Sequence, residues 1–285
     1  MSVVLGLDLG GSTSRALLLE GDDDVLLEER NGACNPEAVG EAGAAAVLER
    51  LLAGMRDHPG PAPAACCCGA AGADGQEARQ RMHRLLARLL PGIPIKVVPD
   101  PLLVLAAARL ERGVAVISGT GSIAYGIAEG RTARAGGWGH RLGDEGSGYW
   151  SVREAVRGVL SAHDQGRSLD PAQRELMERA GASDALDLIH RFHNDHEPGR
   201  WAALSGLALR DEKLLEGAAE ELARLVETVR ERLGGKLPVV LAGGVLLNTP
   251  MLEAQVRARL SGSVTRLEAA PVLGAALLAR ALIDR

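Results

Sequence analysis

The stretch that decides the fold is VVLGLDLGGSTSRALLLE, residues 3–20. Apolar residues at 3–7 and 16–19 predict two strands, and the polar, glycine-containing residues 8–13 between them predict a tight turn. The segment therefore predicts a β-hairpin whose turn carries glycines, hydroxyl side chains and, at its mouth, the carboxylate of Asp8.

A second segment, VAVISGTGSIAYGIAEG at residues 114–130, has the same plan. A shift of 109 positions places Gly10 on Gly119 (119 − 10) and Glu20 on Glu129 (129 − 20). Two similar hairpins could arise by chance, but a duplicated unit explains both the spacing and the shared turn chemistry. We therefore expect the chain to contain two copies of one structural unit.

Strands and helices alternate in the rest of the chain. Helices are predicted at about 36–57, 75–90, 101–111 and 272–283, further strands at 64–69, 95–98 and 239–242, a glycine-rich loop at 136–148, and helices from there to about 233. This alternation is typical of an α/β protein. We expect an N-terminal lobe of residues 1–111 and a C-terminal lobe of residues 112–285, with the last helix a candidate to pack back on the first lobe.

The composition is that of a globular protein: 285 residues, 46% hydrophobic and 24% charged, with a net charge of −5. Lys and Arg form no run, which argues against nucleic acid as a partner. No basic region precedes an apolar N-terminal stretch and no segment is long enough to span a bilayer, so a cytoplasmic protein without a membrane partner is expected. Cys34 and Cys66-Cys67-Cys68 do not resemble a disulfide framework, and the run of three predicts buried residues of a core strand.

Both hairpin turns are candidates for binding phosphate. Glycines let the backbone approach a ligand closely, and the resulting array of N–H groups can surround a phosphate. The candidate residues are Gly10, Gly11, Ser12, Thr13 and Arg15 in the first hairpin and Gly119, Thr120, Gly121 and Ser122 in the second. Neither turn is a Walker loop or a dinucleotide-binding fingerprint, because the lysine motif is missing and a strand follows each turn.

Two further positions fit the same nucleotide chemistry. Asp8 beside a phosphate suits Mg²⁺ held through water, although an aspartate there could instead bond the turn's own amides. The segment LAGGVLLN, residues 241–248, ends a strand with Gly243 and Gly244, which would let a base or ribose lie against the backbone near Asn248. A plain strand-to-helix turn is the alternative for this segment.

Taken together, these motifs resemble the two phosphate motifs and the adenosine motif of the actin, hexokinase and Hsp70 superfamily. The segment GGWGHRLGDEGSGYW, residues 136–150, further resembles the N-acetylglucosamine kinase branch of the BadF/BadG/BcrA/BcrD ATPase family. The resemblance spans essentially the whole chain. It implies two ribonuclease-H-like lobes with an interlobe cleft for ATP and substrate, and commonly a homodimer.

The resemblance also implies roles for individual residues. Asp100 matches the carboxylate that acts as general base at the sugar 6-hydroxyl. The residues that match sugar contacts are Asn35, Thr120, Gly121 and Asp144, with Trp138 nearby. Asn35 and Asp100 each precede a proline, so both also fit as helix N-caps.

The resulting hypothesis is an ATP- and Mg²⁺-dependent kinase acting on the 6-hydroxyl of N-acetylglucosamine or glucosamine. One alternative is an ATPase activator of a dehydratase or reductase, which would need cysteines for an iron–sulfur cluster. Another is a sensor that binds ATP and sugar without turnover. His190, His193 and His196 have a spacing that allows a structural zinc site, although solvated histidines are commoner.

Overall fold

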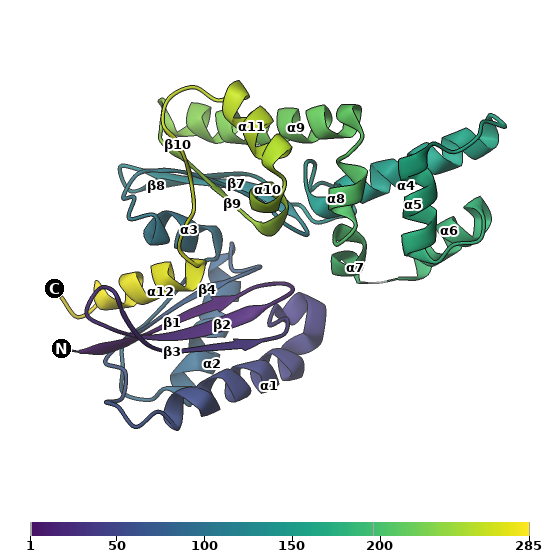
Figure 1. Ribbon diagram of the computed structural model, residues 1–285. Helices are drawn as coiled ribbons and strands as arrows, with labels where there is room; N and C mark the ends of the chain where they lie inside the picture. The colour runs from purple at the N-terminus through teal and green to yellow at the C-terminus, as the bar shows by residue number, and fades with distance from the viewer. Residues whose placement is uncertain (1, 196, 285) are drawn as a thin grey trace. The chain divides into compact units, whose positions relative to one another are not determined.

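The computed structural model describes residues 2–195 and 197–284. The chain divides into two compact units, shown in Figure 1: unit 1 is Met1–Glu111 with Leu267–Arg285, and unit 2 is Arg112–Arg266. The last helix of the chain therefore belongs to unit 1, although most of the C-terminal half belongs to unit 2. In the part of the chain that the structure describes, no helix is both long and apolar enough to cross a membrane.

Unit 1 contains a five-stranded sheet with the order β3-β2-β1-β4-β5. Its elements are β1 (Val3–Leu9), β2 (Ser14–Glu20), β3 (Asp24–Asn31), α1 (Pro36–Arg56), β4 (Cys66–Ala70), α2 (Gln76–Leu89), β5 (Ile95–Pro99), α3 (Pro101–Ala107) and α12 (Pro271–Arg280). Strands β1, β2 and β3 are antiparallel, whereas β4 and β5 run parallel to β1. Helix α1 is interrupted at Gly40, which has φ 73°.

Strand β1 is buried on both faces, which explains its nearly continuous apolar sequence. Leu5 and Leu7 pack with α1, while Val4 packs with α12 on the opposite face. A Cβ at Gly6 would lie 2.6 Å from the backbone of α12, so this helix approaches the sheet as closely as only glycine allows. The predicted burial of the cysteine run is confirmed: Cys66 and Cys68 face one core and Cys67 faces the other.

Unit 2 repeats this topology with the order β10-β9-β6-β7-β8. Its elements are β6 (Gly113–Ser118), β7 (Ser122–Ala128), β8 (Arg131–Gly136), α4 (Gly148–Asp164), α5 (Pro171–Ala180), α6 (Ala185–Asn194), α7 (Pro198–Ala202), α8 (Ser205–Ala208), α9 (Glu212–Leu233), β9 (Val239–Ala242), α10 (Gly244–Asn248), α11 (Pro250–Arg259) and β10 (Val264–Arg266). Strands β6 to β8 are antiparallel, and β9 and β10 run parallel to β6.

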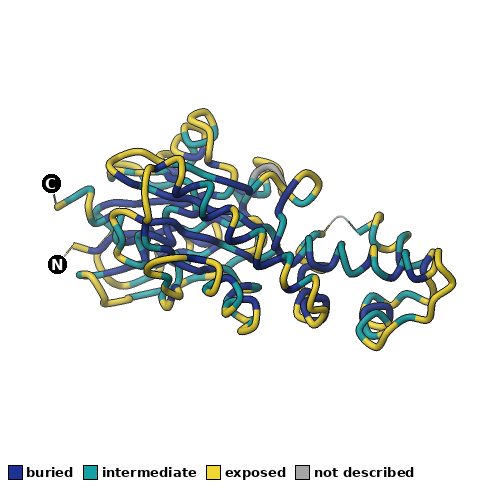
Figure 2. The backbone as a smooth tube through the Cα atoms, turned by 90° about the horizontal axis from the view of Figure 1, so that it is seen from above, coloured by how far each residue is buried: buried dark blue, intermediate teal, exposed yellow. Residues whose placement is uncertain are grey.

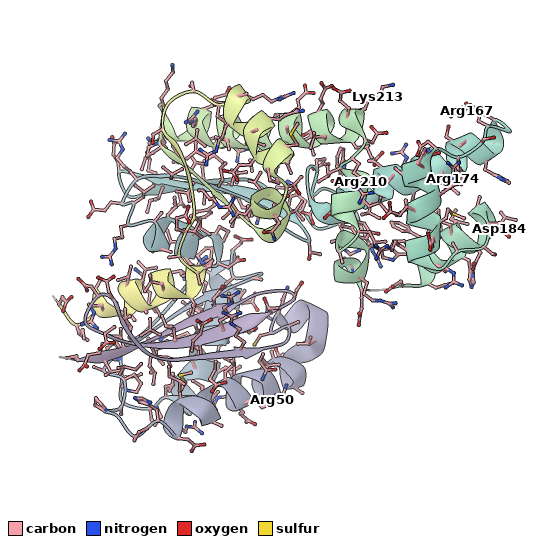
Figure 3. All side chains as sticks on the ribbon, in the orientation of Figure 1. Arg50, Arg167, Arg174, Asp184, Arg210 and Lys213 are labelled. Carbon is pink, nitrogen blue, oxygen red and sulfur yellow. The ribbon has the colours of Figure 1, made fainter. Side chains whose placement is uncertain are left out.

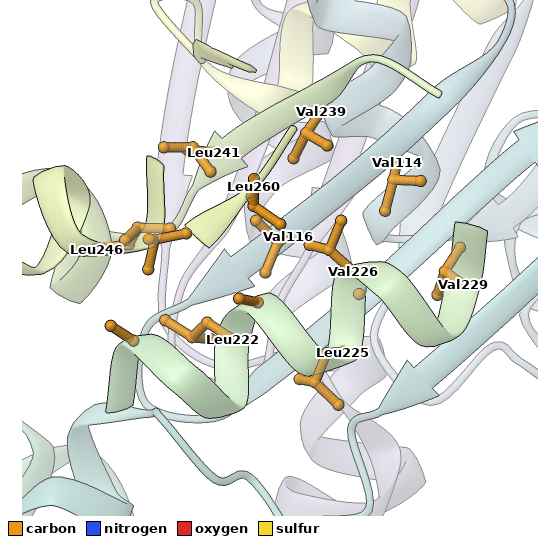
Figure 4. Packing of buried hydrophobic residues seen from close by; sticks show 14 of the residues in the cluster. Val114, Val116, Leu222, Leu225, Val226, Val229, Val239, Leu241, Leu246 and Leu260 are labelled. Carbon is orange, nitrogen blue, oxygen red and sulfur yellow. The ribbon is translucent and has the colours of Figure 1, made fainter. Parts of the chain in front are cut away.

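The predicted duplication is confirmed by the strand register. The pairing of β1 with β4 begins at Leu5, and the pairing of β6 with β9 begins at Val114. These two residues are 109 positions apart (114 − 5), the shift that relates the two hairpins. The core of unit 2 lies between its sheet and α9, where Leu222 and Val226 pack against Val116 and Leu241 (Figure 4). In Figure 2 the buried stretches follow the strands and the inner sides of the helices.

A helical insertion distinguishes unit 2 from unit 1. In unit 1 a single helix, α1, leads from the third strand to the fourth, and it packs against that sheet. In unit 2 the corresponding connection holds α4 to α8 before α9 packs against the sheet. Residues 148–208 therefore form the insertion, with a separate hydrophobic core that includes Val152, Leu188 and Trp201.

Candidate functional site

The first hairpin turn presents its backbone to solvent. Strands β1 and β2 leave residues 10–13 as the turn, which the Gly10 N–H closes by donating to the Thr13 carbonyl at 3.0 Å. A Cβ at Gly10 would lie 2.6 Å from that carbonyl oxygen, so the turn requires glycine there. Gly11, Ser12 and Thr13 are exposed. These three residues remain the predicted phosphate ligands of the first turn.

Asp8 lies at the carboxyl end of β1, directly opposite Arg15 of β2. Burial raises the pKa of Asp8 from 3.8 to about 6, and the nearby Arg15 guanidinium opposes this increase. Arg15 also forms an ion pair of 3.5 Å with Glu28. Asp8 is therefore a desolvated carboxylate that a neighbouring cation would stabilise in its charged form.

The same sheet edge holds Asn35 and Asp100. The Cys34 N–H donates to the Gly10 carbonyl at 3.2 Å, so the residue just before Asn35 is held against the first turn. Asp100 follows β5, two strands from β1 in the sheet, so the ends of these strands lie about 10 Å apart. Carboxyl ends of parallel strands are where ligands bind in open α/β sheets.

Two details at this edge differ from the sequence prediction. Asp100 takes the expected N-cap position before Pro101, but it has helical backbone angles (φ −56°, ψ −35°) and its side chain makes no capping bond to α3. Gly72, which the sequence prediction missed, has φ 78°, and its Cβ position lies 3.4 Å from the Asn35 amide oxygen. Only its place after β4 could have indicated it.

The second hairpin turn is bonded to the glycine-rich segment that follows β8. Gly119 N–H donates to the Gly121 carbonyl at 2.9 Å and closes a turn of three residues. Gly148 and Tyr149 in turn donate their N–H groups to the Gly119 and Thr120 carbonyls, at 2.8 and 3.3 Å. The beginning of α4 is therefore fixed against this turn.

The position of Ser122 differs from its predicted role as a phosphate ligand. The side chain is buried, and its hydroxyl donates to the Glu145 carbonyl at 2.7 Å. The hydroxyl therefore joins the turn to the glycine-rich segment and has no donor left for a phosphate.

Asp144 lies directly against the second turn. A Cβ at Gly121 would be 2.7 Å from Asp144 Oδ2, and the Gly139 N–H donates to Asp144 Oδ1 at 3.3 Å. Asp144 is buried and has φ 61°, a left-handed conformation that aspartate tolerates better than most residues. Burial raises its pKa, and the backbone N–H bonds oppose that shift. Thr120, Gly121 and Asp144 are thus brought together.

Trp138 is 66% exposed. The Arg134 guanidinium lies 4.5 Å from the centre of its ring, a cation–π arrangement that the sequence prediction missed. Trp138 immediately precedes Gly139, whose N–H bonds Asp144. The indole therefore offers a large apolar surface to solvent on the segment that also holds Asp144.

A pocket of about 470 Å³ joins the second turn to the end of β9, and we call it the hairpin pocket. It is lined by Gly119, Thr120, Gly199, Ala202, Ala203, Ser205, Gly206, Gly244, Val245, Asn248 and Thr249. Gly243, with φ 92°, packs directly on the Ser118 backbone, and the Asn248 amide lies 3.7 Å from the Cβ position of Gly244. The wall formed by residues 199–206 was not predicted, since small residues in a helical insertion carry no motif.

The other candidate metal ligands form no site among the residues that the structure describes. His196 lies outside the described residues, and His190 bonds Asn194 on the surface of α6. Nowhere in residues 2–195 and 197–284 do three or more His, Cys, Asp or Glu side chains form a group that could hold a metal ion. Burial raises the pKa values of Cys34, to about 11, and of the other three thiols. These thiols are therefore poor ligands.

Comparison with known proteins places the chain among ATPases and sugar kinases. The family model described as the BadF/BadG/BcrA/BcrD ATPase family matches residues 5–188. An N-acetylmuramic acid/N-acetylglucosamine kinase of Clostridium acetobutylicum is 31% identical over 306 residues, which cover 100% of both chains. An N-acetyl-D-glucosamine kinase of Dictyostelium discoideum is 27% identical, with 97% of each chain covered.

Solved structures confirm the predicted fold class, α/β with two ribonuclease-H-like lobes of the actin-like ATPase type. A Chromobacterium violaceum structure with the provisional description N-acetylglucosamine kinase matches with TM-score 0.78 and 26% identity, covering 98% of this chain and 99% of that one. A ROK hexokinase from Thermus thermophilus matches with TM-score 0.59 and 20% identity, covering 99% of each chain. At this lower identity the likeness concerns the fold alone.

Proposed function

Because the chain belongs to the BadF/BadG/BcrA/BcrD ATPase family, we propose that it is an ATP-dependent kinase that phosphorylates the 6-hydroxyl of an amino sugar, N-acetylglucosamine or glucosamine. The observation that carries the proposal is the second turn, where Gly119 and Thr120 line the hairpin pocket and Asp144 lies against Gly121. One turn thus joins a nucleotide-sized pocket to a buried carboxylate suited to a sugar hydroxyl. The kinases to which the chain is similar support the same reaction class.

The nucleotide would use both hairpin turns and the end of β9. The backbones of the exposed residues 11–13 and of the half-buried second turn suit phosphates, because fixed backbone dipoles stabilise negative charge. Gly244 and Asn248 in the hairpin pocket suit the adenosine moiety, since a glycine leaves room for a flat base beside an amide that can bond it. Arg15 adds a cation near the first turn.

Mg²⁺ fits the residues beside the first turn. Asp8 is a carboxylate at the end of β1 whose burial raises its pKa, and a hard oxygen ligand of this kind suits Mg²⁺ held through water. When bound, the ion would offset the charge of the ATP phosphates. The chain's own contribution is to hold a single carboxylate at that place.

Asp100 is the proposed general base. It lies at the same sheet edge as Asp8 and Asn35, and its side chain makes no capping bond to α3. A carboxylate within reach of the sugar hydroxyl would orient it and accept its proton as the phosphoryl group is transferred. Asn35, Thr120, Gly121, Asp144 and Trp138 are the proposed sugar contacts, with the exposed indole suited to an apolar face of the ring.

The cysteines argue against the alternative of an iron–sulfur activator. All four are buried within unit 1, and Cys67 faces the opposite side of the sheet from Cys66 and Cys68.

The proposal includes a homodimer, which sedimentation of the purified protein would check.

The test is a screen of ADP release with MgATP and a panel of hexoses and amino sugars. We expect N-acetylglucosamine or glucosamine to give the highest kcat/KM, at least about tenfold above glucose, the usual effect of one recognised polar group. ADP release that no sugar accelerates would overturn the proposal. Preference for glucose would overturn the amino-sugar assignment.

A further inference from the structure

A second pocket lies within the helical insertion of unit 2, and we call it the arginine pocket. It has a volume of about 460 Å³ and lies among α5, α6 and α7. Its lining residues are Arg179, Ala180, Arg191, Asn194, Asp195, Glu197, Arg200, Trp201 and Leu204. None of them belongs to the proposed kinase site.

Three guanidinium groups face this one pocket from three elements. Arg191 Nη1 lies 3.5 Å from the Cβ position of Gly181, so the Arg191 side chain reaches from α6 to the end of α5, where Arg179 lies. Arg200 comes from α7. Like charges gathered around a cavity repel one another, and an anion between them would remove that repulsion.

The ion pairs with nearby acidic residues leave these three guanidinium groups with free N–H donors. Arg191 pairs with Asp187 at 3.0 Å, Arg200 with Asp195 at 3.1 Å, and Arg179 only loosely with Glu175 at 3.9 Å. Each guanidinium has five N–H donors, and these arginines are 46–72% exposed, where ion pairs contribute little. Asp195 is itself occupied, because its second oxygen accepts the Glu197 N–H at 2.9 Å.

Trp201 supplies an independent indication of a ligand. The residue is 5% exposed, and its ring packs edge-on against Phe192 with the centroids 4.7 Å apart. Among the residues that the structure describes, none accepts a hydrogen bond from its buried Nε1–H. A buried N–H without an acceptor is unfavourable, and an oxygen of a bound anion would satisfy it.

Helix α7 connects this pocket to the hairpin pocket. Gly199, Ala202 and Ala203 line the hairpin pocket, whereas Arg200, Trp201 and Leu204 line the arginine pocket. The two sets alternate at helical spacing, so they lie on opposite sides of one short helix. A ligand that draws Arg200 and Trp201 inward would also move backbone that lines the hairpin pocket.

We propose that the arginine pocket binds a small phosphate monoester, of the size of a phosphorylated monosaccharide, and that this binding changes nucleotide affinity through α7. Guanidinium groups bind phosphate oxygens with paired N–H donors. The pocket is larger than a phosphate ion, and Ala180 and Leu204 give it an apolar part that suits the rest of the ligand. The coupling rests on the proposed nucleotide site, whereas binding of the phosphate does not.

Calorimetry on the full chain tests the binding, with MgCl₂ and a non-hydrolysable ATP analogue saturating the hairpin turns. The probes are glucose 6-phosphate, inorganic phosphate and glucuronate. We expect glucose 6-phosphate to bind at one site, about tenfold or more tightly than glucuronate, because a dianion makes more charge-assisted bonds than a carboxylate. Absence of binding, or equal binding of glucuronate, would overturn the phosphate site.

Substitutions locate the site. Arg191→Gln and Arg200→Gln should each weaken glucose 6-phosphate binding about tenfold or more, and Trp201→Phe should weaken it several-fold. The control is Arg167→Gln, which removes the same charge from the end of α4, where Arg167 donates to Gln165 outside the pocket (Figure 3). Wild-type affinity in both arginine variants, or an equal loss in the control, would overturn the assignment. Melting temperatures check that each variant is folded.

The coupling is measured as the affinity for the ATP analogue with and without glucose 6-phosphate. We expect a change of about fivefold or more in the wild-type protein and none in Arg191→Gln. Equal affinities in the wild type would overturn the coupling. Failure of the analogue to bind at all would instead contradict the proposed kinase function, and the phosphate-binding measurement without nucleotide would still decide the arginine pocket.

Discussion

Asp100 carries the chemistry of the proposed reaction. Asp100→Asn keeps the shape of the side chain but cannot take a proton, so kcat should fall about 10²-fold or more while the KM values for sugar and ATP change far less. Stability should change little, because no capping bond to α3 is lost. Steady-state kinetics and thermal unfolding measure both effects. Asp57→Asn, at an exposed carboxylate of unit 1, is the control. Near-normal turnover of Asp100→Asn would remove the general base.

Asp144 makes stability depend on pH. Burial raises its pKa in the folded protein above the usual 3.8, so the folded state binds the proton more tightly than the unfolded state. The free energy of unfolding therefore falls as the pH rises from about 4 through the raised pKa. Asn cannot ionise and tolerates φ 61°, so Asp144→Asn should lack this decrease and be at least as stable at pH 7.

Urea unfolding between about pH 4 and 7 measures this difference. Asp144→Ala is the matched control, because alanine also lacks the charge but is disfavoured at φ 61° and should be less stable at every pH. If Asp144→Asn is less stable than the wild type at pH 7, the N–H bonds from Gly139 and Ser122 outweigh the cost of burying the charge.

At the scale of elements, α7 and α8 form an unexpected wall of the hairpin pocket. Ala203 lines this pocket and is exposed, so a larger side chain there would enter the pocket without disturbing a core. Ala203→Phe should weaken binding of an ATP analogue about tenfold or more and leave the melting temperature unchanged. Ala203→Ser, which adds only one oxygen, is the control. Unchanged affinity in Ala203→Phe would place the nucleotide elsewhere.

The elements predicted best are those whose sequence pattern is set by burial. Strands β1, β4 and β6 are mostly apolar because both faces are covered, and their positions follow from sequence alone. Strands β3 and β8 were missed, because half-exposed strands at the sheet edge carry mixed polar sequence. Local patterns also cannot show which helix of an insertion reaches a pocket, so the wall at residues 199–206 was missed too.

Among the predicted site residues, some lie where the sequence indicated and others do not. Gly121 and Asp144 do meet, as the family resemblance implied, because the glycine-rich segment is bonded to the second turn. Asp100 takes the expected N-cap position without the side-chain bond, because its backbone angles are helical. The Ser122 hydroxyl is bonded to the Glu145 carbonyl. The sequence specifies neither of these features.

At the scale of the whole molecule, the chain repeats one sheet topology and adds an insertion to the second copy. Each sheet carries a glycine-containing hairpin turn at the corresponding place, so duplication by itself supplies two candidate phosphate-binding turns. The insertion then adds residues 199–206 to the hairpin pocket of unit 2. This division predicts that the repeated units supply phosphate binding, while the insertion adjusts nucleotide affinity.

The most direct measurement of the central claim is the phosphorus balance of one reaction followed by ³¹P NMR. The purified protein is incubated with MgATP and N-acetylglucosamine or glucosamine. We predict equal amounts of ADP and phosphorylated sugar, with the new phosphorus coupled to the two protons of the C6 methylene group. ADP formed without phosphorylated sugar, or a phosphorus coupled to a single ring proton, would contradict the account.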